Sequence, residues 1–134
     1  MPASFFDTNV LVYLASEDVE KADRAERLVA EGGAISVQVL NELASVARRK
    51  MRMSWPECRA LLSSLQSLLE VRPLTVDTHA AGVALAERYG LSIYDSMIAA
   101  AALEAKCDVL WSEDMQHGLR IAGLNILNPF QAES

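Results

Sequence analysis

Two aspartates each follow a short apolar segment of the sequence. Asp7 comes directly after Ser-Phe-Phe at positions 4–6, and Asp114 closes the Ser-Glu-Asp triplet that follows Val-Leu-Trp at positions 109–111. Short apolar runs of this kind are typical of buried strands, and open α/β sheets bind their ligands at the carboxyl ends of the strands. The two carboxylates therefore indicate a binding or catalytic site at one edge of a parallel sheet.

Two further acidic residues lie in segments with helical periodicity. Glu42 falls inside an apolar stripe, with apolar residues at positions i−3, i+1 and i+4 around it. Asp95 stands in the first turn before positions 97–103, which hold no polar side chain, and a helix that is apolar all round is a buried one. A buried carboxylate has to be paired, protonated or bound to a cation, because an isolated buried charge is very costly.

Each of these four carboxylates also has an ordinary structural explanation. Glu42 can reach water from the edge of its stripe or pair with an arginine, and Asp95 can cap its helix. Asp7 and Asp114 can be capping or turn residues. Their convergence favours a shared site, because the two strand ends and the two helix starts lie at one edge of the sheet if the connections are right-handed.

A shared site of this composition suits a hard divalent cation. Four carboxylates in one crevice repel one another and raise their own pKa values unless a cation lies between them. Oxygen ligands without histidine or cysteine favour Mg²⁺ or Mn²⁺ over zinc. Two such ions, about 4 Å apart, are the usual apparatus of phosphodiester hydrolysis. The acidic residues therefore point to metal-assisted cleavage of a phosphodiester.

The segments that position these residues alternate between strands and helices. We expect strands at 4–6, 34–36, 71–74, 109–111 and 125–127. We expect helices at 8–15, 18–31, 37–50, 56–69 and 77–89, and a buried helix that begins near Asp95. Strands that alternate with helices imply a parallel sheet. The predicted fold is therefore α/β, a single domain over residues 1–134 with a central parallel sheet of four to five short strands flanked by helices.

Helix caps support several of these boundaries. Ser54 and Glu57 have the spacing of a capping box. Asp77 is placed to cap the helix at 77–89, and Gly90 is placed to end it.

Composition narrows the class of protein. The chain has 134 residues, of which 51% are hydrophobic, which is enough for one core and one domain. No apolar run approaches the ~18 residues of a membrane span, and the N-terminus lacks the pattern of a secretion signal, so we expect a cytoplasmic protein with no membrane partner.

Cys58 and Cys107 have neither metal-ligand spacing nor a disulfide pattern. The net charge of −6 means that a polyanionic substrate needs local help, such as bound cations.

Four short motifs resemble those of the PIN-domain nucleases. In chain order they are Asp7-Thr8-Asn9, Asn41-Glu42, Tyr94-Asp95-Ser96 and Ser112-Glu113-Asp114. Their order and spacing are most similar to those of the VapC-type toxins of bacterial type II toxin-antitoxin pairs, and the resemblance reaches the closing Asn128-Pro129-Phe130. The Ser that follows Asp95 departs from the more usual Ala.

The resemblance implies a function and a set of site residues. The implied catalytic and metal-binding residues are Asp7, Glu42, Asp95 and Asp114, and no organic cofactor is implied. Ser112 would support the pocket with its hydroxyl. The implied activity is that of an Mg²⁺- or Mn²⁺-dependent endoribonuclease, a hydrolase in which a metal-activated water cuts RNA without a covalent intermediate. The implied partners are an RNA substrate, a cognate antitoxin that fills the groove, and a second copy of the chain in a homodimer.

A basic cluster is the candidate RNA contact. Arg48, Arg49, Lys50 and Arg52 are four of the 12 basic residues within five positions. We hypothesise that they contact the RNA backbone; the alternative is a helix C-terminus whose cations suit the helix dipole. Asn9 can touch a metal-bound water or a phosphate, or only help to start the first helix.

Two other functions compete with the nuclease. A receiver-like signalling module would carry paired acids after its first strand and a late lysine, whereas this chain has one Asp there and no Lys after Lys106. A catalytically silent α/β binding module would use its acidic residues only as caps. Metal dependence of stability or of activity separates both from a nuclease.

Overall fold

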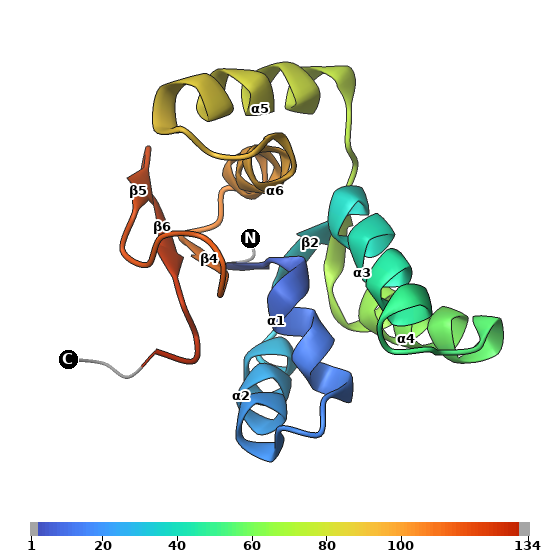
Figure 1. The fold of residues 1–134 in the computed structure, drawn as a ribbon. Coiled ribbons are helices and arrows are strands. Elements are labelled where there is room, and N and C mark those ends of the chain that lie inside the picture. Colours follow the sequence, from blue (N-terminus) through green and yellow to red (C-terminus); the bar gives the residue numbers. More distant parts are fainter. Residues whose placement is uncertain (1–2, 132–134) are drawn as a thin grey trace.

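Six short strands form one sheet in the computed structural model, which describes residues 3–131 (Figure 1). They are β1 (Ser4–Phe6), β2 (Ala34–Ser36), β3 (Glu70–Arg72), β4 (Val109–Trp111), β5 (Arg120–Ile121) and β6 (Leu124–Leu127). Their order across the sheet is β3-β2-β1-β4-β6-β5, and every neighbouring pair is parallel except β5 and β6. The predicted α/β fold with a central parallel sheet is confirmed.

The antiparallel strand β5 is an addition to the predicted strands. It is two residues long and joins β6 through Ala122 and Gly123, which have φ values of 51° and 102°. Positive φ at both central residues is the geometry of a tight two-residue hairpin turn. The sheet therefore has six strands, where four to five were expected, because so short a strand leaves no periodic signal in the sequence.

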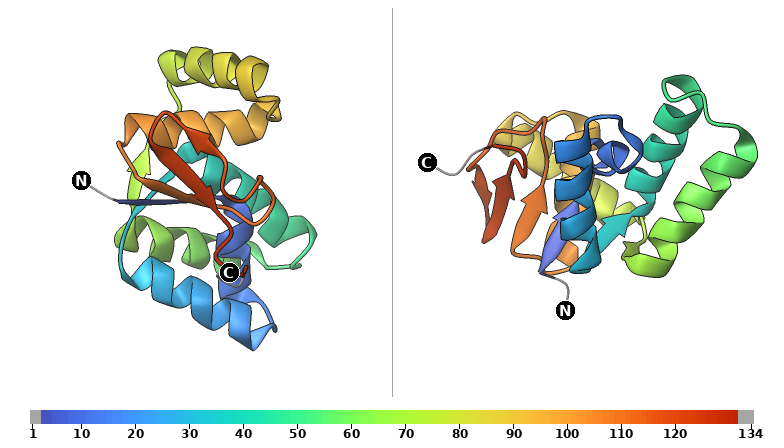
Figure 2. Two further views of the ribbon diagram at one scale, coloured as in Figure 1. Left: turned by 90° about the vertical axis from the view of Figure 1, so that its left-hand side faces the viewer. Right: turned by 90° about the horizontal axis from the view of Figure 1, so that it is seen from below.

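Helices lie on both sides of the sheet. They are α1 (Thr8–Val12) with a 3-10 turn η1 (Tyr13–Ala15), α2 (Val19–Ala30), α3 (Val37–Arg49), α4 (Trp55–Leu68), α5 (Val76–Tyr89) and α6 (Ile93–Glu104). Figure 1 shows α5 and α6 stacked above the sheet and α1 and α2 below it, with α3 and α4 beside each other where β2 lies. The left-hand view in Figure 2 shows the same layers from the side. No helix among residues 3–131 is long and apolar enough to cross a membrane.

Helix α6 is the buried helix that the sequence predicts. Residues 96–102 are all buried, and most of them are alanine. Such small side chains allow α5 to pack closely on α6: a Cβ added at Gly82 of α5 would lie 2.7 Å from Sδ of Met97. The close packing of α5 holds α6 against the sheet. It thereby also holds the first turn of α6, which carries Asp95.

The helix caps agree with the sequence at two of three places. The capping box of Ser54 and Glu57 is present, and Gly90 ends α5 in the left-handed region with φ 71°. Asp77 does not cap α5. Thr75 does so instead, because its hydroxyl accepts from the backbone N–H of Thr78 at 3.1 Å.

Candidate active site

Asp7 lies at the point where β1 ends and α1 begins. The strand is central in the sheet, and only 3% of the Asp7 surface is exposed. Oδ1 accepts the backbone N–H of Thr8 at 2.7 Å, so Asp7 caps α1. Oδ2 accepts the hydroxyl of Ser112 at 2.7 Å and the side-chain amide of Asn9 at 3.1 Å. The carboxylate is therefore held in one orientation by three donors.

Ser112 and Asn9, the two predicted supporting residues, join Asp7 to the loop after β4. Ser112 is fully buried, and its hydroxyl also accepts the backbone N–H of Met115 at 3.1 Å. Oδ1 of Asn9 accepts the backbone N–H of Glu113 at 3.0 Å. These bonds place the loop that carries Asp114 beside the end of β1.

Glu42 lies on α3, half-buried, and faces the start of α1. Oε1 accepts the hydroxyl of Thr8 at 2.8 Å, and Oε2 accepts the side-chain amide of Gln38 at 2.8 Å. Among residues 3–131 it forms no ion pair with an arginine. Neutral donors therefore satisfy Glu42 and leave its charge uncompensated.

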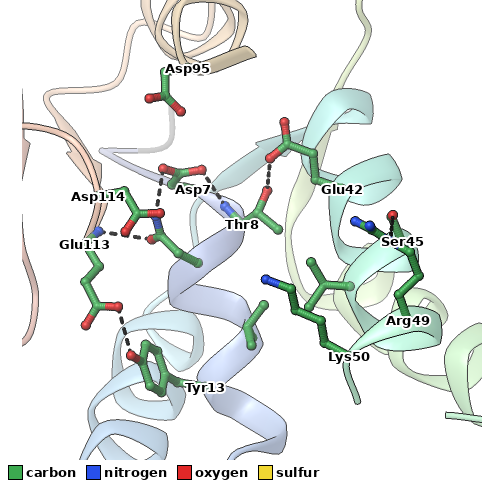
Figure 3. Close-up of a pocket in the computed structure, with 13 residues that line it drawn as sticks. Asp7, Thr8, Tyr13, Glu42, Ser45, Arg49, Lys50, Asp95, Glu113 and Asp114 are labelled. Atoms are coloured by element: carbon green, nitrogen blue, oxygen red, sulfur yellow. Dashed lines mark hydrogen bonds between the residues drawn. The ribbon is translucent and has the colours of Figure 1, made fainter. Parts of the chain in front are cut away.

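Asp95 and Asp114 approach the same space from two other elements. Asp95 is half-buried in the first turn of α6, where Ser92 rather than Asp95 provides the cap, since the Ser92 hydroxyl accepts the backbone N–H of Asp95 at 3.1 Å. Asp114 is exposed in the loop after β4. The four predicted carboxylates, drawn with their neighbours in Figure 3, thus come from the end of β1, from α3, from α6 and from the loop after β4.

All four line one pocket of about 430 Å³. Its acidic part is formed by these carboxylates, and Ser45, Arg49 and Lys50 line it farther along α3. Within the described part of the chain, the two ion pairs are Lys21 with Glu113 and Arg72 with Glu70, so neither involves the four predicted acidic residues.

The environment raises the pKa of Asp7 from 3.8 to about 7. Burial is the largest cause, and the negative charges of Asp95 and Glu42 raise it further, while hydrogen bonds from Ser112 and Thr8 lower it. The pKa of Asp95 is also raised, first by burial and then by the charges of Glu42 and Asp114. The site therefore gathers like charges that repel one another, which is the condition that a bound cation relieves.

The donor set fits Mg²⁺ or Mn²⁺ in its chemistry. All the candidate ligands are oxygens, and a buried carboxylate with no cationic partner is the main feature of the site. In the positions described for residues 3–131, however, no three Asp, Glu, His or Cys side chains form a group that could hold an ion. The carboxylates thus line a common pocket without forming such a group as their side chains lie.

A cluster of Tyr13, Lys21 and Glu113 lies at another wall of the pocket, which Tyr13 and Glu113 line, and sequence reasoning missed it. The Tyr13 hydroxyl donates to Oε1 of Glu113 at 2.8 Å, and Nζ of Lys21 donates to Oε2 at 2.8 Å. The rings of Phe130 and Tyr13 pack edge to face, with centroids 4.8 Å apart and an interplanar angle of 67°. No local pattern relates residues about a hundred positions apart in the chain, so this contact gave no signal in the sequence.

The basic cluster divides into two pairs. Arg49 and Lys50 line the pocket. Arg48 instead donates to the carbonyl of Met53 at 2.6 Å and lies 4.2 Å from the ring centroid of Trp55, and Arg52 lines a separate depression. Helical spacing from Glu42 is the sequence signal that could have separated the two pairs.

The chain matches the family model of the PIN domain over residues 4–120. A search of curated proteins found no match.

Solved structures of similar fold come from several bacteria. A toxin-antitoxin complex from Klebsiella pneumoniae has a TM-score of 0.74 at 23% identity, covering 96% of this chain and 99% of that chain. VapBC2 from Rickettsia felis, bound to a DNA fragment from its promoter, has a TM-score of 0.66 at 25% identity, covering 93% and 97%. The sarcin-ricin loop cleaving toxin VapC20 from Mycobacterium tuberculosis has a TM-score of 0.67 at 19% identity, covering 83% and 89%.

Proposed function

Because the chain belongs to the PIN domain family, we propose that it is a metal-dependent endoribonuclease that acts as the toxin of a toxin-antitoxin pair. One observation carries the proposal: the buried carboxylate of Asp7 shares a pocket with Glu42, Asp95 and Asp114, and none of the four forms an ion pair within residues 3–131. The similarity to toxin-antitoxin complexes and to an RNA-cleaving toxin supports the same assignment.

In this proposal the four carboxylates hold Mg²⁺ or Mn²⁺. A bound divalent ion supplies charge neutralisation and a nucleophile from water near neutral pH. Asp7 is the fixed ligand, because Ser112, Asn9 and Thr8 hold its orientation. Asp95 and Asp114, which belong to other elements, move to complete the site.

The proposed partners follow from the same family of complexes. We assign to the chain a cognate antitoxin, because the solved structures of similar fold include a toxin-antitoxin complex from Klebsiella pneumoniae. That the antitoxin covers the pocket, and that a second copy completes a homodimer, is proposed from the resemblance to the VapC-type toxins. The cytoplasm, where RNA is available, is the proposed location.

One observation favours a silent binding module as the second candidate. Asp7 caps α1, and the side chains as they lie include no three-ligand group within residues 3–131. In such a module the acidic residues are caps and hydrogen-bond acceptors, and neither RNA cleavage nor metal binding follows.

Cleavage of RNA distinguishes the two candidates. The purified protein, free of antitoxin, is incubated with total RNA and with tRNA in Mg²⁺, in Mn²⁺ and in EDTA, beside an Asp95→Asn control. We expect discrete fragments that require the metal and that are absent from the control, because Asp95 supplies one of the proposed ligands. Intact RNA under all conditions, together with no binding of Mn²⁺ by calorimetry, would support the silent module.

A further inference from the structure

One face of α3 carries an acidic residue at one end of the pocket and two basic residues at the other. Glu42, Ser45, Val46, Arg49 and Lys50 all line the pocket and stand at positions i, i+3, i+4, i+7 and i+8. Residues with this spacing lie on one side of a helix. Seven residues of helix correspond to about 10 Å along the axis, so the cationic end is separate from the carboxylates but within the same pocket.

Arg49 and Lys50 are oriented toward this pocket. Nε of Arg49 donates to the hydroxyl of Ser45 at 3.0 Å, which keeps the guanidinium on the pocket wall. Lys50 is the C-cap residue of α3, and Figure 3 shows its side chain extending from α3 into the space beside α1. Neither side chain belongs to the ion pairs found within residues 3–131, so both retain charge that an anion can use.

The other two basic residues of the cluster are directed elsewhere. Arg48 donates a hydrogen bond to the Met53 carbonyl and lies over the Trp55 ring. Arg52 lines a separate depression with Met51 and Met53. Arg52 also has a positive φ of 54°, which turns the chain away after α3. The four residues are adjacent in sequence, yet only two of them line the pocket.

We propose that Arg49 and Lys50 form a phosphate-binding subsite for the RNA backbone, and that Arg48 and Arg52 take no part in it. The subsite rests on the proposed nuclease function. About 10 Å along α3 separates it from Glu42, so it contacts a phosphate other than the one that is cut at the carboxylates. Two cations on the pocket wall offset the repulsion that a chain of net charge −6 exerts on a polyanion.

The test compares two double variants with the same change of charge. Both are made in the Asp95→Asn protein, which leaves the RNA uncut. The test variant is Arg49→Ala/Lys50→Ala, and the matched control is Arg48→Ala/Arg52→Ala. Binding of a fluorescein-labelled single-stranded RNA of mixed sequence is measured by anisotropy from 50 to 200 mM KCl, with thermal melts to confirm folding. The logarithm of the association constant falls linearly with the logarithm of the salt concentration. Removal of one cationic side chain that neutralises a phosphate makes this negative slope shallower by ~0.7.

We expect the negative slope of the Arg49/Lys50 double variant to be shallower by about 1.4, because two phosphates are no longer neutralised. We also expect this variant to bind RNA at least tenfold more weakly at 50 mM KCl. The Arg48/Arg52 control is expected to match the parent protein. Equal losses of affinity in both variants would overturn the subsite, because only the overall charge would then matter.

Two other outcomes overturn the subsite in different ways. In the first, both variants bind RNA like the parent, but only Arg49→Ala/Lys50→Ala loses binding to a labelled decaglutamate peptide. Arg49 and Lys50 then bind an acidic protein partner, and the nuclease function stands if the wild-type protein still cuts RNA. If the wild-type protein neither binds nor cuts RNA with metal present, the proposed function and the subsite both fail.

Discussion

Asp7 has the most perturbed ionisation of the candidate site residues. A carboxyl group that is almost fully buried beside two like charges favours its neutral form, which is why its pKa rises to about 7. The hydrogen bond from Ser112 favours the charged form and limits the rise. At neutral pH Asp7 is thus near its own titration point, and a bound cation shifts it to the charged state.

This pKa makes a prediction for stability against pH. Between pH 4 and 7 the folded protein holds a proton on Asp7 that the unfolded chain releases, so the free energy of unfolding falls as pH rises. In Asp7→Asn this contribution is absent. We expect the free energy of unfolding of the wild type, minus that of the variant, to become more negative from pH 5 to pH 8. Urea titrations in EDTA measure the difference.

An Asp108→Asn variant is the control for that experiment, because Asp108 is exposed and lies outside the pocket. Its difference from the wild type should stay nearly constant over the same range. A constant difference for Asp7→Asn as well would mean that Asp7 keeps an ordinary pKa in solution.

The place of a residue at the pocket was predictable where its position in the sequence decides the side chain's location. Asp7 and Asp114 were expected there because each follows a buried strand, and Asp95 because it precedes an all-apolar segment; all three line the pocket, and their catalytic role stays a prediction. Lys21 and Glu113 were not found, because their contact depends on how α2 approaches the loop after β4. A sequence pattern carries the first kind of information and not the second.

At the scale of elements, boundaries were predictable where capping or periodicity is strong. α4 begins within one residue of its expected start because Ser54 and Glu57 form a reciprocal cap. The start of α5 was assigned to the wrong cap, since Thr75 and Thr78 satisfy each other and leave Asp77 in the first turn. Where several neighbouring polar residues can each cap a helix, sequence spacing alone does not decide which of them does so.

The contact of α5 with α6 gives the prediction at this scale. In Gly82→Ala the new Cβ would meet Sδ of Met97 at 2.7 Å and its Cα at 3.3 Å, so the buried Met97 side chain or α5 must shift, although alanine is the better helix former. We expect a loss of about 1–3 kcal/mol in the free energy of unfolding, measured by urea denaturation.

The double variant Gly82→Ala/Met97→Ala provides the cross-check. Because truncation of Met97 removes the clash, the two substitutions should be less destabilising together than the sum of their separate effects. Strict additivity would show that the close approach of α5 to Met97 does not limit stability.

At the scale of the molecule, the proposed metal site joins parts that are remote in sequence. Its carboxylates belong to β1, α3, α6 and the loop after β4, so a cation that binds them stabilises the whole fold rather than one element. The sequence predicted this convergence through the rule for parallel connections, but it could not predict how the four side chains are oriented, and as they lie no three of them among residues 3–131 form a group that could hold an ion.

Binding of Mn²⁺ should therefore raise the melting temperature. A ligand that binds only the folded state at a hundredfold excess over its Kd adds ~2.7 kcal/mol. We expect this rise in the wild type and a much smaller one in Asp95→Asn, by calorimetry with and without EDTA. Glu104→Gln, which alters an acidic residue outside the pocket, should keep the full rise. An unchanged melting temperature in the wild type would argue against the metal site.

The short strands at the two borders of the sheet restrict how other chains can attach. β3 has three residues and β5 has two, and β5 turns back in a tight hairpin. Unpaired backbone at the border of a sheet is a template for strand addition and for aggregation, and very short border strands remove most of that template. The borders of the sheet therefore offer a partner chain little backbone for strand addition, and they also offer little template for fibril-like association.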